Sequence, residues 1–136
     1  MDSEKRVLII DDEHAIADTL VAVFLSEGYA ARAAYSAEEA LPLIAEWNPQ
    51  LAIIDVYMPG MNGIDLALIL KAQHPGCGFL LFSGALQTSE LIEAARQAGH
   101  TFEVLAKPVP PPELLGRVGQ FFPPELGLSA AIPETV

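Results

Sequence analysis

Three short apolar runs that begin or end beside polar residues constrain the fold of this chain more than any other feature. They are residues 7–10, 51–54 and 79–82, built mostly of isoleucine, leucine and phenylalanine. A strand with one face in water alternates apolar with polar residues, whereas a strand covered on both faces reads as a continuous apolar run. The three runs therefore predict strands at the centre of a sheet that is covered on both sides.

Segments with helical spacing separate these runs. Helices are predicted around residues 16–24, from residue 37, and over residues 63–73, 91–98 and 113–122, with weaker strands over residues 30–35 and 102–105. Gly28 and Gly99 are suitable helix ends, and Ser36 with Glu39 forms a capping box. Pro42 should shorten or bend the second helix. The five strands and five helices predict an α/β fold, the flavodoxin-like doubly wound parallel sheet with strand order 2-1-3-4-5.

Composition limits the class of protein. The 136 residues, 51% of them hydrophobic, suit one compact domain, which we place at residues 5–121 with a loosely ordered tail at residues 122–136. The net charge of −11 disfavours direct binding to nucleic acid. The single cysteine suits a reducing compartment. No stretch approaches the roughly 20 apolar residues that cross a bilayer. We therefore expect a cytoplasmic protein without membrane contact.

Polar residues follow four of the predicted strands. Asp11 and Asp12 follow the first, Asp55 ends the third, Ser83 follows the fourth and Lys107 follows the fifth. Because the carboxyl ends of parallel strands share one edge of the sheet, these side chains should converge there. Each alone is more typical of a turn, a cap or the surface, but their joint occurrence at one edge favours a functional site.

This group of side chains suits a cation and phosphoryl chemistry. Carboxylates about 4 Å apart repel one another by roughly 1 to 4 kcal/mol per pair, depending on the effective dielectric constant. A divalent cation with oxygen ligands, Mg²⁺ in the first place, removes this repulsion and neutralises phosphoryl oxygens. An aspartate can itself be the nucleophile and form an aspartyl phosphate. Residues 58–63, Met-Pro-Gly-Met-Asn-Gly, predict a tight turn after Asp55, in which Asn62 and Gly63 tolerate positive φ.

Four motifs taken in order resemble the receiver domain of two-component response regulators. They are residues 7–13, 55–63, 82–84 and 107–108, and the resemblance covers residues 5–121. It implies a single-domain response regulator in which Asp55 accepts a phosphoryl group from a sensor histidine kinase or a histidine phosphotransfer protein. The downstream protein is not identified by the sequence. The chain would catalyse only its own phosphorylation and dephosphorylation.

The resemblance also assigns roles around Asp55. Asp11, Asp12 and Asp55, with the backbone carbonyl of Tyr57, would hold Mg²⁺, and Mn²⁺ is a possible substitute. Ser83 would turn toward the phosphoryl group and Lys107 would pair with it. The Lys107-Pro108 peptide bond would be cis.

Three positions depart from the family's pattern. The residue three before Lys107, which is usually an aromatic switch, is Val104. The residues two after Asp55 and two after Ser83 are Tyr57 and Ala85. Neither carries a carboxylate or amide that would orient water at close range, so we expect slow loss of the phosphoryl group.

Two other functions fit parts of the pattern. One is a constitutive protein-interaction domain of receiver fold, which the intact acidic set and Lys107 disfavour. The other is a phosphatase of the haloacid-dehalogenase type, which also uses an aspartyl nucleophile. That class usually carries Asp-x-Asp, and Tyr57 stands at its second position here.

Overall fold

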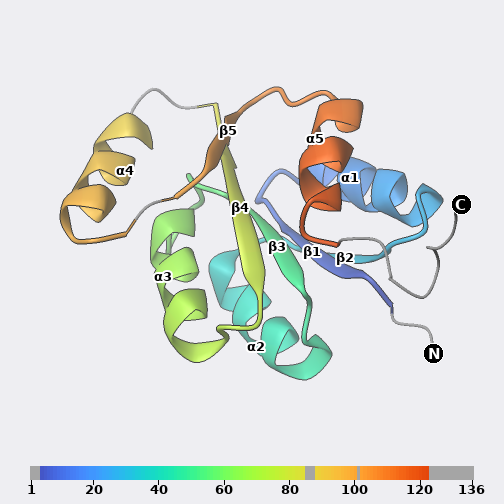
Figure 1. Cartoon of the computed structure of the whole chain (residues 1–136), viewed down its shortest axis with the longest axis horizontal. Helices are drawn as coiled ribbons and strands as arrows, with labels where there is room; N and C mark the ends of the chain where they lie inside the picture. Colours follow the sequence, from blue (N-terminus) through green and yellow to red (C-terminus); the bar gives the residue numbers. More distant parts are fainter. Residues whose placement is uncertain (1–3, 85–87, 101, 123–136) are drawn as a thin grey trace, which may run out of the picture.

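A five-stranded parallel sheet with helices on both faces forms the body of the chain (Figure 1). The computed structural model describes residues 4–84, 88–100 and 102–122. The strands are β1 (Arg6–Ile10), β2 (Ala30–Ala34), β3 (Leu51–Asp55), β4 (Gly78–Ser83) and β5 (Val104–Ala106). The helices are α1 (His14–Ser26), α2 (Ala37–Trp47), α3 (Gly63–Gln73), α4 (Thr88–Gln97) and α5 (Pro111–Gly119). The strand order is β2-β1-β3-β4-β5, as the sequence predicts.

The side chains of each central strand divide between two cores. In β1, Leu8 and Ile10 pack on one face with α2 and α3, whereas Val7 and Ile9 pack on the other face with α1 and α5. All four are fully buried. Successive residues of a strand point to opposite faces, so a strand with helices on both sides must be apolar at every position. This explains the apolar runs in the sequence. The parallel strand order places the carboxyl ends of β1, β3 and β4 side by side.

The predicted strand bounds hold to within about two residues, whereas helix α4 begins at Thr88 and not at residue 91. The sequence predicts a strand over residues 102–105, but β5 begins at Val104, which pairs with Leu81. Phe102 instead packs its ring against Phe79, with 5.7 Å between ring centroids, and is 9% exposed. The apolar character of Phe102 thus reflects burial in the core and not strand pairing. Helix α5 ends at Gly119, earlier than the predicted residue 122.

Pro42 does not cut the second helix short. Helix α2 is 11 residues long, and Pro42 lies inside it. Pro42 lacks the amide that would bond the carbonyl of Glu38, and both residues are exposed, so water can bond that carbonyl instead. Ser36 and Glu39 form the predicted start: the Ser36 hydroxyl accepts a hydrogen bond from the Glu39 amide at 3.0 Å.

The chain's end is described only in part. Of the predicted tail at residues 122–136, Phe122 packs against Tyr29, with ring centroids 5.5 Å apart, and residues 123–136 lie outside the described residues. Within the described ranges, none of the helices has both the length and the apolar character needed to span a bilayer.

Candidate functional site

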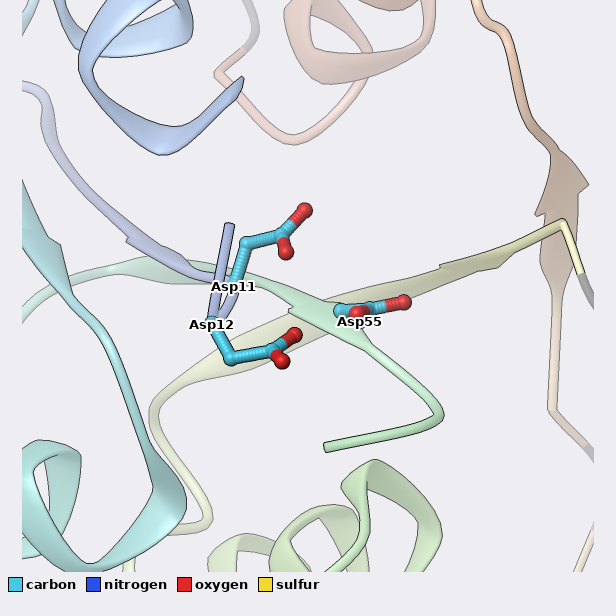
Figure 2. A group of neighbouring side chains, drawn as sticks. All are labelled: Asp11, Asp12 and Asp55. Carbon is cyan, nitrogen blue, oxygen red and sulfur yellow. The ribbon is translucent and has the colours of Figure 1, made fainter. Parts of the chain in front are cut away.

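Three aspartates meet at the carboxyl edge of the sheet. Asp11 and Asp12 follow β1, and Asp55 is the last residue of β3, the strand next to it. One carboxylate oxygen from each lies within 4.8 Å of the others, and Figure 2 shows the three side chains grouped at the strand ends. Asp11 is fully buried and Asp55 is 5% exposed. The predicted convergence of these carboxylates is therefore present in the structure.

Lys107 reaches into this group from the end of β5. Its Nζ lies 3.1 Å from Asp11 Oδ2 and 3.4 Å from Asp55 Oδ1. The carboxylate of Glu13 is 3.7 Å away on the more exposed side. The Lys107-Pro108 peptide bond is cis, as the resemblance implied. Three carboxylates thus lie within 4 Å of one ammonium group, and Asp12 adds a fourth carboxylate beside Asp11 and Asp55, which leaves a local excess of negative charge.

The electrostatics of the site follow from this crowding. Burial, followed by the charge of Asp11, raises the pKa of Asp55 to about 7, although Lys107 acts in the opposite direction. Burial alone would lower the pKa of Lys107, but its hydrogen bonds to and charge attraction with Asp11 and Asp55 outweigh burial and raise the pKa. Buried carboxylates that are not fully neutralised form a fitting site for a hard divalent cation with oxygen ligands. The donor set therefore fits Mg²⁺.

An open hollow of about 360 Å³ lies over Asp55. Its lining residues come from four strand ends: Asp12, Glu13, Asp55, Tyr57, Ser83, Gly84 and Lys107. Ser83 is the last residue of β4 and 7% exposed, and its carbonyl accepts a hydrogen bond from the Lys107 amide at 3.0 Å. The structure brings Ser83 and Lys107 to the same rim as Asp55, as predicted. Ala85 lies outside the described residues.

The loop between β3 and α3 forms one wall of this hollow. Tyr57 is 37% exposed and lines the hollow, so its side chain borders the approach to Asp55. The positive φ in this loop falls on Gly60, at 79°, and not on Asn62 or Gly63 as the sequence suggested. Asn62 has φ −82° and its side chain caps α3 by accepting a hydrogen bond from the Asp65 amide.

Gly63 is needed here for a different reason. A Cβ built on it would lie 2.3 Å from the backbone oxygen of Asp55, far inside van der Waals contact. Its amide donates to the Val56 carbonyl at 2.8 Å. The first residue of α3 therefore packs directly beneath the backbone of Asp55.

Two residues near the site had no assigned role in the sequence analysis. Glu13 adds a carboxylate to the group around Lys107, and its position next to Asp12 was the available signal. Glu38, in the first turn of α2, accepts a hydrogen bond from the Met61 amide at 3.1 Å. No sequence signal indicates this contact, because it joins residues 23 positions apart through a backbone group.

Comparison with known proteins points to one family. Residues 7–119 match the family described as the response regulator receiver domain. A CheY-like response regulator receiver domain protein from Methanospirillum hungatei is 32% identical, with a TM-score of 0.76 over 87% of this chain and 93% of that one. The receiver domain of the Francisella response regulator 1452 is 30% identical, with a TM-score of 0.74 over 87% of this chain and 96% of that chain.

Curated relatives are longer proteins. The DNA-binding response regulator MtrA of Mycolicibacterium paratuberculosis is 29% identical over 84% of this chain and 49% of its own length. The regulatory protein VanR of Enterococcus faecium is 31% identical over 83% of this chain and 48% of its own length. The chain thus spans about half the length of these relatives.

Proposed function

Because this chain belongs to the response regulator receiver domain family, a family of phosphorylation-controlled switches, we propose that Asp55 is the residue it phosphorylates. The observation that supports this proposal is the position of Asp55. It is a buried carboxylate at a strand end, beneath an open hollow, with Lys107 at 3.4 Å. A nucleophile needs access for the donor, and the phosphoryl group needs a positive partner; both are present around this carboxylate.

The reaction is an in-line transfer to the Asp55 carboxylate. One carboxylate oxygen forms a bond to phosphorus while the bond between phosphorus and the donor's leaving atom breaks. The electron pair of that bond stays on the leaving atom, which is an imidazole nitrogen for a phosphohistidine donor. The product is an acyl phosphate on Asp55. Since only the ionised carboxylate attacks, the pKa of about 7 in the metal-free protein makes proton loss from Asp55 part of the preparation for transfer.

Receiver domains of this family typically bind Mg²⁺ at an acidic pocket, and we assign that role here to Asp11, Asp12, Asp55 and the backbone carbonyl of Tyr57. The 4.8 Å limit on the separation of the carboxylate oxygens supports the assignment. Mn²⁺, which also prefers oxygen ligands, is expected to replace Mg²⁺. When bound, the ion would neutralise charge on the phosphoryl oxygens.

Lys107 and Ser83 would hold the transferred group. Lys107 already contacts Asp55, and its ammonium group can pair with a phosphoryl oxygen in place of one carboxylate contact. Ser83 lines the same hollow from the neighbouring strand, and its hydroxyl can donate to another phosphoryl oxygen. A shift of Ser83 toward the new group would carry the signal from Asp55 into β4 and the loop that follows it.

Receiver domains act with sensor histidine kinases, and we propose a sensor histidine kinase or a histidine phosphotransfer protein as the donor. The receiver unit is assigned to residues 5–121. Its activity is that of a response regulator and not of a conventional turnover enzyme. A pull-down with and without phosphorylation would identify the downstream protein.

The test is direct phosphorylation by a small donor. With Mg²⁺ and acetyl phosphate, intact-mass spectrometry should show one added phosphoryl group per chain, and Asp55→Asn should remove it because an amide is a poor nucleophile. Asp65→Asn, on the exposed first turn of α3, is the matched control and should label normally. Labelling of the Asp55→Asn protein at the parent's level would move the site elsewhere. Multiple turnover would indicate a phosphatase, and no labelling of the parent a constitutive interaction domain.

A further inference from the structure

Two neighbouring glutamates at the start of α2 make different contacts. Glu39 completes the helix start, because its Oε1 accepts a hydrogen bond from the Tyr35 amide at 2.8 Å while its own amide donates to the Ser36 hydroxyl. Glu38 takes no part in these bonds. Its Oε2 instead accepts a hydrogen bond from the Met61 amide at 3.1 Å, in the loop between β3 and α3. A helix on one side of the sheet edge is thus joined to the loop that borders the hollow over Asp55.

This loop has well-defined anchors at both ends. At its start the Val56 amide donates to the Phe82 carbonyl at 3.0 Å, and at its end the Gly63 amide donates to the Val56 carbonyl at 2.8 Å. Between them the side chain of Met58 is 7% exposed and packs in the core. Among the contacts described for residues 57–61, the bond from the Met61 amide to Glu38 is the hydrogen bond to another element. It therefore restrains the backbone of the loop that begins with Tyr57 at a point between its two anchored ends.

The loop backbone is shaped to receive the Glu38 carboxylate. Gly60 has φ 79°, a conformation that side chains with a Cβ rarely adopt. A Cβ built on Gly60 would lie 2.8 Å from Glu38 Oε2, so a larger residue would displace the carboxylate as well as strain the turn. The absence of a side chain at Gly60 thus lets the carboxylate approach the backbone and reach the next amide.

We propose that Glu38 is a positioning residue for the cation site, acting through the Met61 amide on the loop that carries the Tyr57 carbonyl. The inference rests on the proposed function, since it concerns the same site. Glu38 is not one of the carboxylates grouped around Asp55. It contributes by restricting the loop before the ion arrives, so that the carbonyl of Tyr57 need not be ordered during binding. Groups that orient a metal's ligands typically change affinity by about tenfold or more when removed.

Three variants separate this role from the alternatives. Glu38→Ala removes the acceptor, Glu38→Gln keeps an acceptor oxygen but removes the charge, and Glu39→Ala is the matched control at the next position. For each, the Mg²⁺ dissociation constant is measured by amide NMR titration, and hydrogen exchange of the Met61 amide is measured without metal. Glu38→Ala should weaken Mg²⁺ binding by about tenfold and speed exchange at Met61. Glu38→Gln and Glu39→Ala should stay within about twofold of the parent in Mg²⁺ affinity.

The possible failures are distinguishable. If the parent itself does not bind Mg²⁺, the proposed cation site is wrong and the role of Glu38 toward it is wrong as well. If the parent binds and Glu38→Ala binds equally well, the positioning role alone is refuted. If Glu38→Gln weakens binding as much as Glu38→Ala, the effect comes from the charge and not from the hydrogen bond. Unchanged exchange at Met61 in Glu38→Ala would likewise contradict the proposal.

Discussion

Replacing Asp55 by Asn should stabilise the metal-free protein at neutral and alkaline pH. The carboxylate of Asp55 is buried next to Asp11, and these two effects raise its pKa from 3.8 to about 7 even with Lys107 nearby. A tenfold change in the affinity of a group for its proton corresponds to about 1.4 kcal/mol, so the ionised carboxylate would cost up to about 4 kcal/mol of unfolding free energy. Because the group borders an open hollow and its charge is coupled to its neighbours, we expect about half of this, ~2 kcal/mol.

The sign of the pH dependence follows from proton binding. Between pH 4 and pH 7, the folded protein holds a proton on Asp55 that the unfolded chain has released. The unfolding free energy of the parent should therefore fall as pH rises through this window and then level off. Asn has no proton to lose, so the gap between the variant and the parent should be small near pH 4 and largest above pH 7.

Urea unfolding in the presence of a chelator measures this gap. Parent, Asp55→Asn and the control Asp65→Asn are compared at pH 5, 6, 7 and 8, and the gap for Asp55→Asn should widen with pH while that for Asp65→Asn stays level. Millimolar Mg²⁺ at pH 8 should then raise the midpoint of the parent more than that of Asp55→Asn, because the ion binds the folded carboxylates. A metal-free Asp55→Asn protein less stable than the parent at pH 8, or a gap that does not vary with pH, would refute the reasoning.

Two further outcomes are expected from the three positions that depart from the family's pattern. Beryllofluoride should shift few amide NMR signals in α4, because Val104 cannot swing a ring as the family's usual aromatic does; broad shifts across α4 in the parent would contradict this, and Val104→Tyr should increase the response. Tyr57→Asn combined with Ala85→Glu should speed loss of the phosphoryl group several-fold by orienting water, as measured by phosphate release. An unchanged rate would mean that water access does not set the lifetime.

The sheet and the acidic group were predictable because they depend on patterns that topology converts directly into positions. The apolar runs fix which strands are central, and the parallel order then forces Asp11, Asp12 and Asp55 to one edge. The details that were missed depend on individual backbone contacts. Phe102 is apolar because it fills the core before β5 begins. The contact of Glu38 with Met61 involves a backbone amide, which every residue except proline carries, so no residue type could signal it.

The glycine at the start of α3 has a consequence for how this protein would tolerate change. Gly63 touches no ligand in the proposed reaction, yet any side chain there would press on the backbone of Asp55, with its Cβ at 2.3 Å from the oxygen. In a saturation mutagenesis experiment Gly63 should score as intolerant as Asp55 itself. The mutagenesis scores alone would suggest that Gly63 takes part in the chemistry. Its constraint is one of volume, and in a comparison of many such sequences an invariant glycine at this position would record the packing of a helix beneath a reactive group.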